Sequence, residues 1–478
     1  MISSLFLTAL ASAPIATEVT IYNQDFALVK EQRNLELKLG IQDVLIEDVA
    51  QTIERESVGL RSLTAPGSIS VLEQNYRFDL INADEILNRS VGQEVTLTRH
   101  LPNGSNEEVK GVLLAPPTAI VDGEDGQERV YNGLVIKAAD GRVLINPSGE
   151  ITVTKMPEGM VSRPSLVWKL NSAKAGTNKI ELSYLAGGMS WSANYVLSLD
   201  GAGKIGDLKG WVSLVNGSGI AFKDAKLKLL AGEVNRAARY RYERTEAASR
   251  PADSSGFAIS KMQEEQFADY HLYTSPLPVT IANNEAKQVS LLEGSGVPIT
   301  KKIILDATAG MGRWRSSDEG SVGSGPIKPL VKIEFKNNQA SRLGMPLPAG
   351  TIKVFQKDSS GSLQMLGEAA IDHTPKEEKL SLAVGRAFDI VGERKRTAFA
   401  WLTKKRPRDG SRETFQIEVR NRKDSAETVH VIERAWGQWA ITNASAKQEK
   451  LDANTFQWVL TLKPKEVRKI TYTVETVW

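Results

Sequence analysis

The chain has 478 residues, of which 41% are hydrophobic, so it is long enough to form about three domains with buried cores. Its 60 Lys and Arg residues nearly balance its 57 Asp and Glu residues. The resulting net charge of +3 argues against a nucleic-acid-binding protein, which needs a concentrated basic surface. The absence of cysteine excludes disulfides, a thiolate nucleophile and Cys-type metal sites. Only 4 His residues remain for a catalytic triad or a metal cage.

The chain begins with an apolar leader, MISSLFLTALASAPIATEVT, that has no charged side chain before Glu18. Its apolar run is shorter than the roughly 20 residues that span a bilayer, and small residues provide cleavage sites after Ala13 and after Ala16. We therefore predict a signal peptide over residues 1–16 and a secreted or periplasmic protein. The alternative is an ordinary buried first strand. No later segment reaches transmembrane length, so we expect a protein that is not integral to a membrane.

After the leader, hydrophobic and polar residues alternate with the period of two that is typical of half-buried strands. The clearest runs are NLELKLG (34–40), KIELSYL (179–185), KLKLL (226–230), VKIEF (331–335), FQIEVRN (415–421) and KITYTVETVW (469–478). Short helices are predicted over NADEILNR (82–89) and SKMQEEQFADY (260–270). The expected fold class is all-β, with several small β-sandwich or barrel domains in series.

Changes in composition divide the chain into six segments. They are a signal peptide (1–16), an N-terminal β domain (17–88), a small SH3-like or Sm-like β barrel (89–158), the first part of a β sandwich (159–234), a flexible insertion (235–262) and a C-terminal β sandwich (263–478). The small barrel is predicted from short strands joined by tight turns. The insertion is predicted because the alternation is lost in a stretch rich in Arg, Ala and Ser.

Several long motifs follow one another along the chain. They are YLAGGMSWSANY, GWVSLVNGSGIAFKDAKLKLLAGEVN, DYHLYTSPLPVTIANNEAKQVSLL, GMPLPAG, and IDHTPKEEK followed by GRAFDIVGERK. Together they resemble a bacterial family of domains of unknown function that is related to mucoidy inhibitor proteins. The resemblance covers nearly all of the chain after the leader and implies an exported, β-rich protein. It implies no activity, because the family has no agreed one.

Two short motifs match functional patterns but lack the structural context that those patterns need. GAGKIG (201–206) has the spacing of a dinucleotide fingerprint, yet a strand-like segment rather than a helix follows it, so we interpret it as a hairpin turn. GGMSWS places Ser190 in a G-x-S setting, but Ser192 stands where a nucleophile elbow needs glycine. We expect Trp191 and Tyr195 in a sandwich core.

A basic stretch, ERKRTAFAWLTKKRPRDGSRE (393–413), holds eight Lys and Arg residues and three acids, interleaved with Phe399 and Trp401. One interpretation is a surface that binds nucleic acid, phospholipid headgroups or acidic glycans. The favoured interpretation is a hairpin whose solvated charges flank a buried FAWL stripe. Asp389, just before this stretch, and Arg394, within it, are predicted to form a buried structural pair.

The segment IDHTPKEEK (371–379) is the strongest candidate for a polar site. Neighbouring residues of a strand point to opposite faces, so Asp372 and His373 converge on one site only if a turn intervenes. Pro375 favours such a turn, and we predict a structural corner in which His373 or Thr374 bonds the turn backbone.

The enzyme alternative combines the same segment with a distant histidine. It would join His373 and Asp372 to His271 of DYHLY and to a carboxylate such as Glu377, as an envelope hydrolase or metal-dependent enzyme. A discriminating observation is whether the two histidines converge with a carboxylate.

The sequence thus predicts an exported β protein with a binding or structural role at the cell envelope, without a catalytic centre, cofactor or metal. The expected partner is an envelope protein or polysaccharide, and not nucleic acid. Two alternatives stay open: the enzyme that uses the Asp372/His373 region, and a protein-interaction module built on the small barrel.

Overall fold

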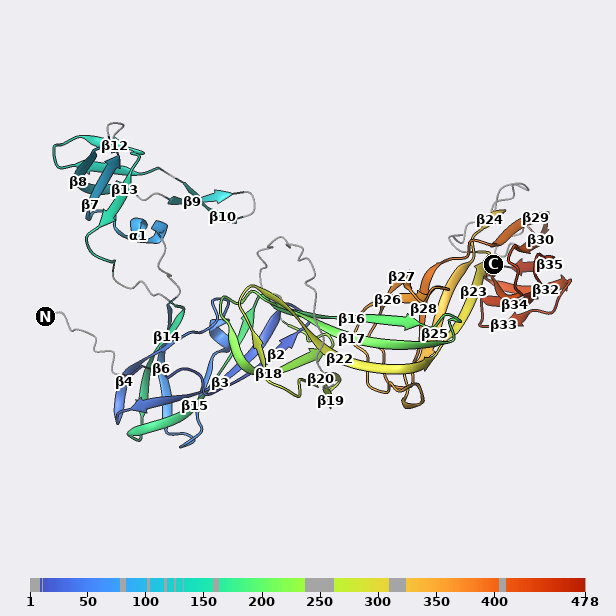
Figure 1. Ribbon diagram of the computed structural model, residues 1–478, viewed down its shortest axis with the longest axis horizontal. Helices are drawn as coiled ribbons and strands as arrows, with labels where there is room; N and C mark the ends of the chain where they lie inside the picture. The colour runs from blue at the N-terminus through green and yellow to red at the C-terminus, as the bar shows by residue number, and fades with distance from the viewer. Residues whose placement is uncertain are drawn as a thin grey trace. The chain divides into compact units, whose positions relative to one another are not determined.

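The computed structural model describes residues 9–10, 12–77, 83–100, 104–115, 118–123, 126–131, 133–157, 163–236, 262–308, 324–403 and 410–477. The strands form several separate sheets, which confirms the all-β class (Figure 1). The chain divides into two compact units. Residues 1–190, 215–229 and 277–287 form the first unit, and residues 191–214, 230–276 and 288–478 form the second. No helix in the described ranges is long and apolar enough to cross a membrane.

The first unit contains two sheets built from its N-terminal strands and from strands much later in the sequence. The first sheet has the order β1 (Ala9–Leu10), β4 (Gly40–Glu47), β14 (Ser165–Ser172) and β6 (Ile69–Arg77). The second includes, as neighbours in this order, β18 (Phe222–Ala231), β2 (Ala16–Tyr22), β3 (Phe26–Leu37), β15 (Gly176–Gly187) and β5 (Gly59–Ser62), with β21 (Val279–Ile281) paired to β18. A short 3-10 helix, Arg55–Ser57, precedes β5. Strands β14 and β15 therefore complete sheets that begin with residues 9–77.

Strand β3 shows how the alternation of the sequence becomes a buried face. Leu35 and Leu37 are buried, whereas the residues between and before them are exposed. Two of the inward positions hold charges, Glu31 and Arg33, and these pair at 2.6 Å with both side chains 2% exposed. Arg33 Nη1 also donates to the Glu47 carbonyl at 2.8 Å. The attraction within a buried ion pair offsets the cost of desolvation only when such additional hydrogen bonds satisfy the remaining polar atoms.

Residues 83–157 of the first unit form a small sheet of their own. Helix α1 (Ala83–Arg89) precedes five strands in the order β12 (Val143–Ile145), β11 (Val135–Ala138), β8 (Asn106–Ala115), β7 (Glu94–His100) and β13 (Glu150–Val153). The hairpin of β9 (Thr118–Gly123) and β10 (Gly126–Tyr131) is inserted between β8 and β11. One face carries a core of Val95, Leu97, Val109, Leu113, Leu134, Ile136 and Ala138, against which Leu87 of α1 packs. Closure of this sheet into an SH3-like or Sm-like barrel stays a prediction.

The second unit contains three sheets and a hairpin. One sheet has the order β22 (Glu285–Pro298), β17 (Ile205–Asn216), β16 (Met189–Leu199), β26 (Gly350–Lys357) and β27 (Leu363–Ile371). The next has the order β28 (Lys379–Arg386), β25 (Leu330–Lys336), β23 (Thr300–Asp306), β31 (Glu427–Arg434), β34 (Thr455–Leu462) and β33 (Glu449–Lys450). The last has the order β24 (Gly325–Ile327), β29 (Ile390–Thr403), β30 (Gly410–Asn421), β35 (Val467–Val477) and β32 (Gln438–Ala444). The hairpin is β19 (Gln263–Phe267) with β20 (Tyr270–Thr274), and a 3-10 helix, Gln339–Ser341, follows β25.

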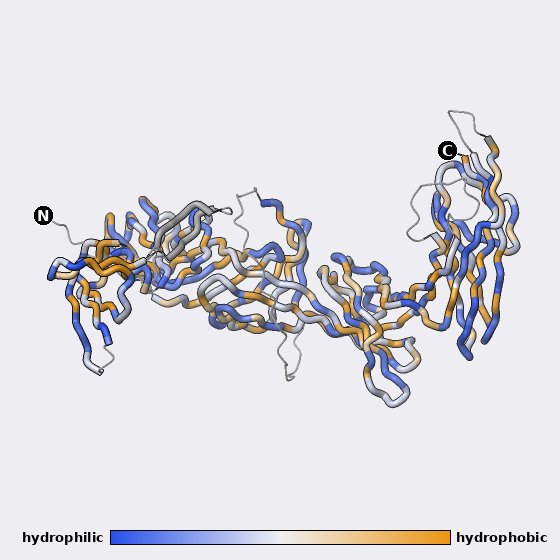
Figure 2. Tube along the Cα trace, turned by 90° about the horizontal axis from the view of Figure 1, so that it is seen from above, coloured by the Kyte–Doolittle hydropathy of each residue, from blue (hydrophilic) through white to orange (hydrophobic). Residues whose placement is uncertain are grey.

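The last two of these sheets share one hydrophobic core, to which β23, β31 and β34 contribute from one side and β29, β30 and β35 from the other. Four aromatic residues, Phe415, Phe456, Trp458 and Tyr472, contact one another in this core with ring centroids 5.0 to 5.8 Å apart. Hydrophobic and hydrophilic positions alternate along these strands, as the sequence pattern predicts (Figure 2).

One of the two predicted helices is present. The helix at Ala83–Arg89 is confirmed, but the helix over 260–270 is wrong, because Gln263–Phe267 is strand β19. Phe267 lies opposite Tyr270 across a tight turn in which Ala268 has a φ of 53°. The segment has no apolar stripe that a helix would bury, so cross-strand pairing decides its structure.

Two further predictions concern residues beyond the described ranges. The insertion predicted at 235–262 falls almost entirely on residues 237–261, and most of the leader falls on residues 1–8 and 11. Both lie outside the described residues.

Candidate functional site

Three asparagines with fully buried side chains each close a corner at which two loops meet. They are Asn216 at the end of β17, Asn337 after β25 and Asn421 at the end of β30. In each case the amide nitrogen lies within hydrogen-bond distance of one carbonyl in its own loop and two in a neighbouring loop, and the amide oxygen accepts a backbone N–H. We call this arrangement an asparagine clamp. Because a buried amide is satisfied on both sides, it fixes two loops relative to each other.

The clamps explain the strand endings SLVN, IEFKN and IEVRN, in which an alternating run stops at Asn. Each Asn at a strand end is visible in the sequence, but the sequence does not show that its side chain links two loops. The three corners lie at unequal spacings along the chain, so no fixed period marks them as related.

The Asn337 clamp builds the corner that contains the predicted polar site. Asn337 Nδ2 donates to the carbonyls of Met345 at 2.8 Å and Pro375 at 3.0 Å. This brings the GMPLPAG segment (344–350) against the HTP segment (373–375). Leu347 and Thr374 then exchange both backbone hydrogen bonds, each 2.8 Å long.

Two buried tyrosines hold the GMPLPAG segment from another side. The Tyr195 hydroxyl donates to the Pro348 carbonyl at 2.9 Å, and the Tyr273 hydroxyl donates to the Pro346 carbonyl at 3.0 Å. Burial raises the pKa of both hydroxyls well above the usual value, so they remain protonated donors. Residues from four of the motifs singled out in the sequence therefore meet at one corner of the second unit.

His373 is tied to the backbone of the same segment. Its Nδ1 accepts the backbone N–H of Ala349 at 3.2 Å. Partial burial lowers the pKa of His373. The charge of Asp372 opposes this, whereas the charge of His271 adds to it. Since Nδ1 accepts a hydrogen bond, the proton of the neutral ring lies on Nε2. In this state the ring has no free lone pair with which to accept a proton or to ligate a metal.

His271 lies near His373 but is bonded to another group. Its Nδ1 is 2.9 Å from Oε1 of Glu264, and the second oxygen of Glu264 is 3.2 Å from Nζ of Lys376. The Glu264 side chain is 10% exposed. The Lys376 ammonium thus compensates the charge of this carboxylate, and the imidazole contacts its other oxygen.

The structure brings together only part of the predicted enzyme site. His271, His373 and Asp372 are neighbours, but Glu377 is exposed and pairs with Lys336 at 2.7 Å. The carboxylate that meets His271 is Glu264, which strand pairing in the β19–β20 hairpin places diagonally across from it. Among the described residues, no group of three or more His, Asp and Glu could hold a metal ion.

The two motifs that mimic functional patterns occupy structural positions. GAGKIG lies in the turn between β16 and β17, where the Asp200 N–H donates to the Ile205 carbonyl at 2.9 Å, which confirms the hairpin turn. Ser190 lies inside strand β16. Trp191 and Tyr195 are 6% and 1% exposed, which confirms their place in a core.

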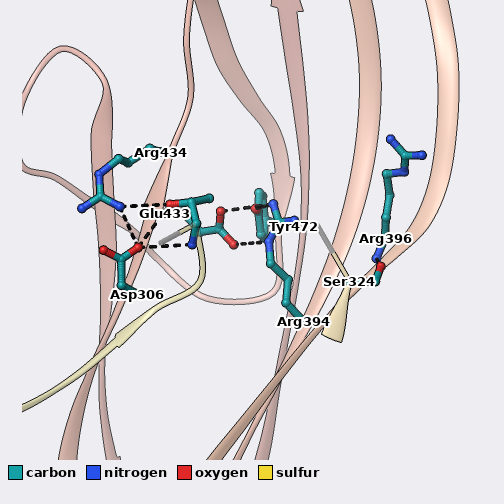
Figure 3. Close-up of polar contacts among 8 residues, drawn as sticks. Asp306, Ser324, Arg394, Arg396, Glu433, Arg434 and Tyr472 are labelled. Carbon is teal, nitrogen blue, oxygen red and sulfur yellow. Dashed lines mark hydrogen bonds and ion pairs between the residues drawn. The ribbon is translucent and has the colours of Figure 1, made fainter. Parts of the chain in front are cut away.

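Arg394 is buried, as predicted, but its partner is Glu433 and not Asp389. Arg394 Nε lies 2.7 Å from Glu433 Oε1, and its Nη2 lies 3.2 Å from Oε2 and 3.3 Å from the Tyr472 hydroxyl (Figure 3). The guanidinium also stacks 3.6 Å from the centroid of the Phe415 ring. Burial raises the pKa of Glu433, and the Arg394 charge opposes this effect. The prediction failed because Glu433 comes from the facing sheet, which local spacing does not reveal.

A second ion pair lies beside this one in Figure 3. Arg434 Nη1 is 2.6 Å from Asp306 Oδ1 and 3.2 Å from the Thr308 hydroxyl. Because Glu433 and Arg434 are adjacent in β31, one points into the sandwich and the other lies half-buried at its margin.

The basic stretch forms the predicted hairpin, β29 with β30, but its burial is the reverse of the prediction. Arg394 and Arg396 are each 5% exposed, whereas Trp401 and Leu402 of the FAWL stripe are 37% and 38% exposed. Arg396 pairs with Glu413 at 3.2 Å. The inward positions of β29 hold arginine because carboxylates compensate them, Glu433 from the facing sheet and Glu413 from the neighbouring strand β30. Residues 404–409 of the stretch lie outside the described residues.

No protein-family model matches the chain, and no curated protein matches it either. The fold and the Asn337 corner define a class: an all-β multidomain protein in which the side chains of the principal polar corner form hydrogen bonds with the backbone.

Proposed function

We propose that the protein is an exported, non-catalytic protein of the cell envelope with a binding or structural role, and that the small sheet is its contact surface for a protein partner. One observation carries the proposal. The face of the small sheet opposite its core presents aliphatic side chains to solvent. They are Val112, Leu114, Val143 and Ile145, with exposed fractions of 38%, 47%, 53% and 73%.

The strand register supports treating these side chains as one stripe. Val143 lies opposite Lys137, and Lys137 lies opposite Val112, across β12, β11 and β8. Ile145 lies opposite Val135 in the neighbouring row. Side chains directly opposite each other in antiparallel strands share a face, so Val143, Ile145 and Val112 lie on one face, with Lys137 between Val143 and Val112.

Two physical arguments favour a protein partner. The exposure of clustered aliphatic side chains to water is unfavourable, and their burial against a partner is favourable. Such patches are typical of interaction sites. The strand β12 also ends the sheet, so its backbone groups are available to a strand from a partner. The corner at His373 supports the non-catalytic part, because its ring nitrogen and the neighbouring carboxylate serve in structural contacts.

Site-specific crosslinking tests the contact surface. A photoreactive residue at position 145 should capture one defined envelope protein, whereas the same residue at position 451, where Leu451 is 50% exposed, should not. The double variant Val143→Glu/Ile145→Glu should lose that partner in pull-downs, and Leu451→Glu should retain it. Capture of the same proteins at both positions would contradict the proposal.

Terminal sequencing of the protein from its native host tests export. The mature chain should begin at Pro14 or Thr17. Cleavage after Ala13 fits the fold better, because it leaves β2 (Ala16–Tyr22) whole and keeps the 2.7 Å hydrogen bond from the Ile15 N–H to the Gln32 carbonyl. Recovery of intact Met1 from the cytoplasm would exclude export.

A further inference from the structure

Phe388 is exceptional among the described residues, because no other large hydrophobic side chain is as exposed, at 93%. It lies in the short loop between β28 and β29, within the GRAFDIVGER motif.

The loop that carries Phe388 is held on both sides. The Ala387 N–H donates to the Pro329 carbonyl at 2.8 Å, and the Asp389 carbonyl accepts the Arg422 N–H at 2.8 Å. Backbone hydrogen bonds on either side fix the path of the chain, so the exposure of Phe388 is a property of the folded loop.

Four exposed basic residues lie on the loops that meet here: Lys328, Arg386, Arg422 and Lys463. Arg386 Nη1 donates to the Lys328 carbonyl at 2.9 Å, and the Asn421 clamp holds the Lys463 carbonyl at 2.9 Å. The bond between the Arg422 N–H and the Asp389 carbonyl and the Asn421 clamp thus bring basic residues of separate segments to the corner that carries Phe388.

These four cations differ from the other basic residues of the same loops. Lys423 and Lys465 are compensated by Glu427 and Asp424 at 2.6 Å and 2.8 Å. Within the part of the chain that the structure describes, none of the four forms an ion pair with a carboxylate. Asp389 is the acid of the Phe388 loop, and Glu466 accepts the Lys463 N–H at 2.7 Å but pairs with Arg468, so the corner keeps a basic excess.

The hairpin turn at Phe267 provides an internal contrast. Phe267 is also an exposed aromatic residue in a tight turn of the second unit, with an exposed fraction of 57%. Its neighbours Glu265 and Asp269 are acidic. The two turns therefore present the same aromatic group in opposite electrostatic surroundings.

We propose that the Phe388 corner docks reversibly onto a membrane surface that carries anionic lipid headgroups. Phe388 enters the headgroup region, and the four cations contact phosphate groups. Because Phe388 projects from a loop, the apolar environment for its ring must come from the partner. A lipid interface offers such an environment at every point of its surface. Exposed cations next to an inserted aromatic side chain are the combination that an anionic interface binds. This inference rests on the proposed envelope location.

Sedimentation of the full-length protein with vesicles tests the inference. Binding should occur with phosphatidylglycerol–phosphatidylcholine vesicles and be at least tenfold weaker with phosphatidylcholine alone or at high salt. Phe388→Ala should lower the partition coefficient about ten- to hundredfold, since the burial of one aromatic side chain is lost. Phe267→Ala should leave it unchanged.

Charge variants test the contribution of the cations to vesicle binding. Arg422→Glu and Lys463→Glu should each weaken vesicle binding by about fivefold or more, whereas Lys353→Glu, an exposed position on β26, should not. Circular dichroism confirms that each variant is folded.

Equal binding by wild type and Phe388→Ala, or no binding to anionic vesicles, would overturn the proposal, as would binding only to a soluble acidic protein. Crosslinking at position 145 is independent of this assay. If that contact persists while vesicle binding fails, membrane docking alone is wrong. If both fail, the proposed function is wrong as well.

Discussion

The corners built on Asn337 and Asn421 share one clamp but present different chemistry. In both, the clamp residue also donates its own backbone N–H to the neighbouring loop that its side chain holds, to the Glu378 carbonyl at 2.8 Å and to the Glu466 carbonyl at 2.9 Å. The Asn337 corner carries histidines that are bonded to its backbone and to a carboxylate. The Asn421 corner carries an exposed aromatic residue and four cations that form no ion pair with a carboxylate of the described residues.

The comparison distinguishes polar residues that stabilise the fold from residues that are available for function. The same buried device occurs in both corners and again at Asn216, so the clamp itself serves the fold. A concentration of polar residues near a clamp is therefore weak support for chemistry. The residues that the corner leaves exposed are the better candidates, and Phe388 with its surrounding cations is the clearest case.

The largest expected effect comes from the cross-sheet ion pair of the sandwich to which Asn421 belongs. Arg394→Met leaves Glu433 buried without its countercharge, and we expect a loss of about 3–5 kcal/mol in the free energy of unfolding. Urea denaturation measures it. The double variant Arg394→Met/Glu433→Leu should recover most of the loss, because it leaves no buried charge without its countercharge. A double variant as unstable as the single one would contradict this account.

The clamps themselves give the next effect. Asn337→Ala and Asn421→Ala each remove several hydrogen bonds and leave buried carbonyls unsatisfied, which should cost about 2–4 kcal/mol in either case. Thermal melts of the two variants compare them directly. Similar losses would support a shared structural device. A much smaller loss at Asn337 would show that its corner is held by other contacts.

His373→Ala should have a smaller effect. It removes the hydrogen bond to the Ala349 N–H at an exposed position, so we expect a loss of about 1 kcal/mol. Melts with and without a chelator extend the test to the enzyme alternative. Neither the wild type nor the variant should respond to the chelator. A wild type that responds, together with a variant that does not, would place a metal at this corner.

The pH dependence of the same corner is the smallest expected effect. The pKa of His373 is lowered in the folded protein, so the unfolded chain binds more protons near pH 6. The contribution of His373 to the free energy of unfolding is complete above the unfolded pKa of about 6.5. It is lost as the pH falls through this value towards the folded pKa. The stability difference between wild type and His373→Ala should therefore shrink from pH 7.5 to pH 5.5. A difference that grows on acidification would show that His373 is stabilised in its charged form.

Much of the fold and some of the corner could be predicted from the sequence. Alternation in NLELKLG and FQIEVRN specifies strands, because each strand face is set by neighbours two residues apart. The turn at Pro375 and the 2.8 Å hydrogen bond from the Thr374 hydroxyl to the Asp372 carbonyl follow from local chemistry in the same way, whereas the bond of His373 to the Ala349 N–H depends on the tertiary structure. The charges of Glu31 and Arg33 also stand two residues apart on one inward face, so their pairing was accessible from the sequence.

Long-range pairing is what only the tertiary structure decided. Glu433 meets Arg394 because two sheets face each other, and Glu264 meets His271 because a hairpin sets their register. The burial of Arg396 and the exposure of Trp401 likewise depend on which carboxylates the neighbouring strands supply. Alternation tells which residues share a face of one strand, but sheet packing determines what that face meets. For this protein, the sequence by itself determined the strands and the turns, and the tertiary structure determined which charges are buried and which aromatic side chain is left in solvent.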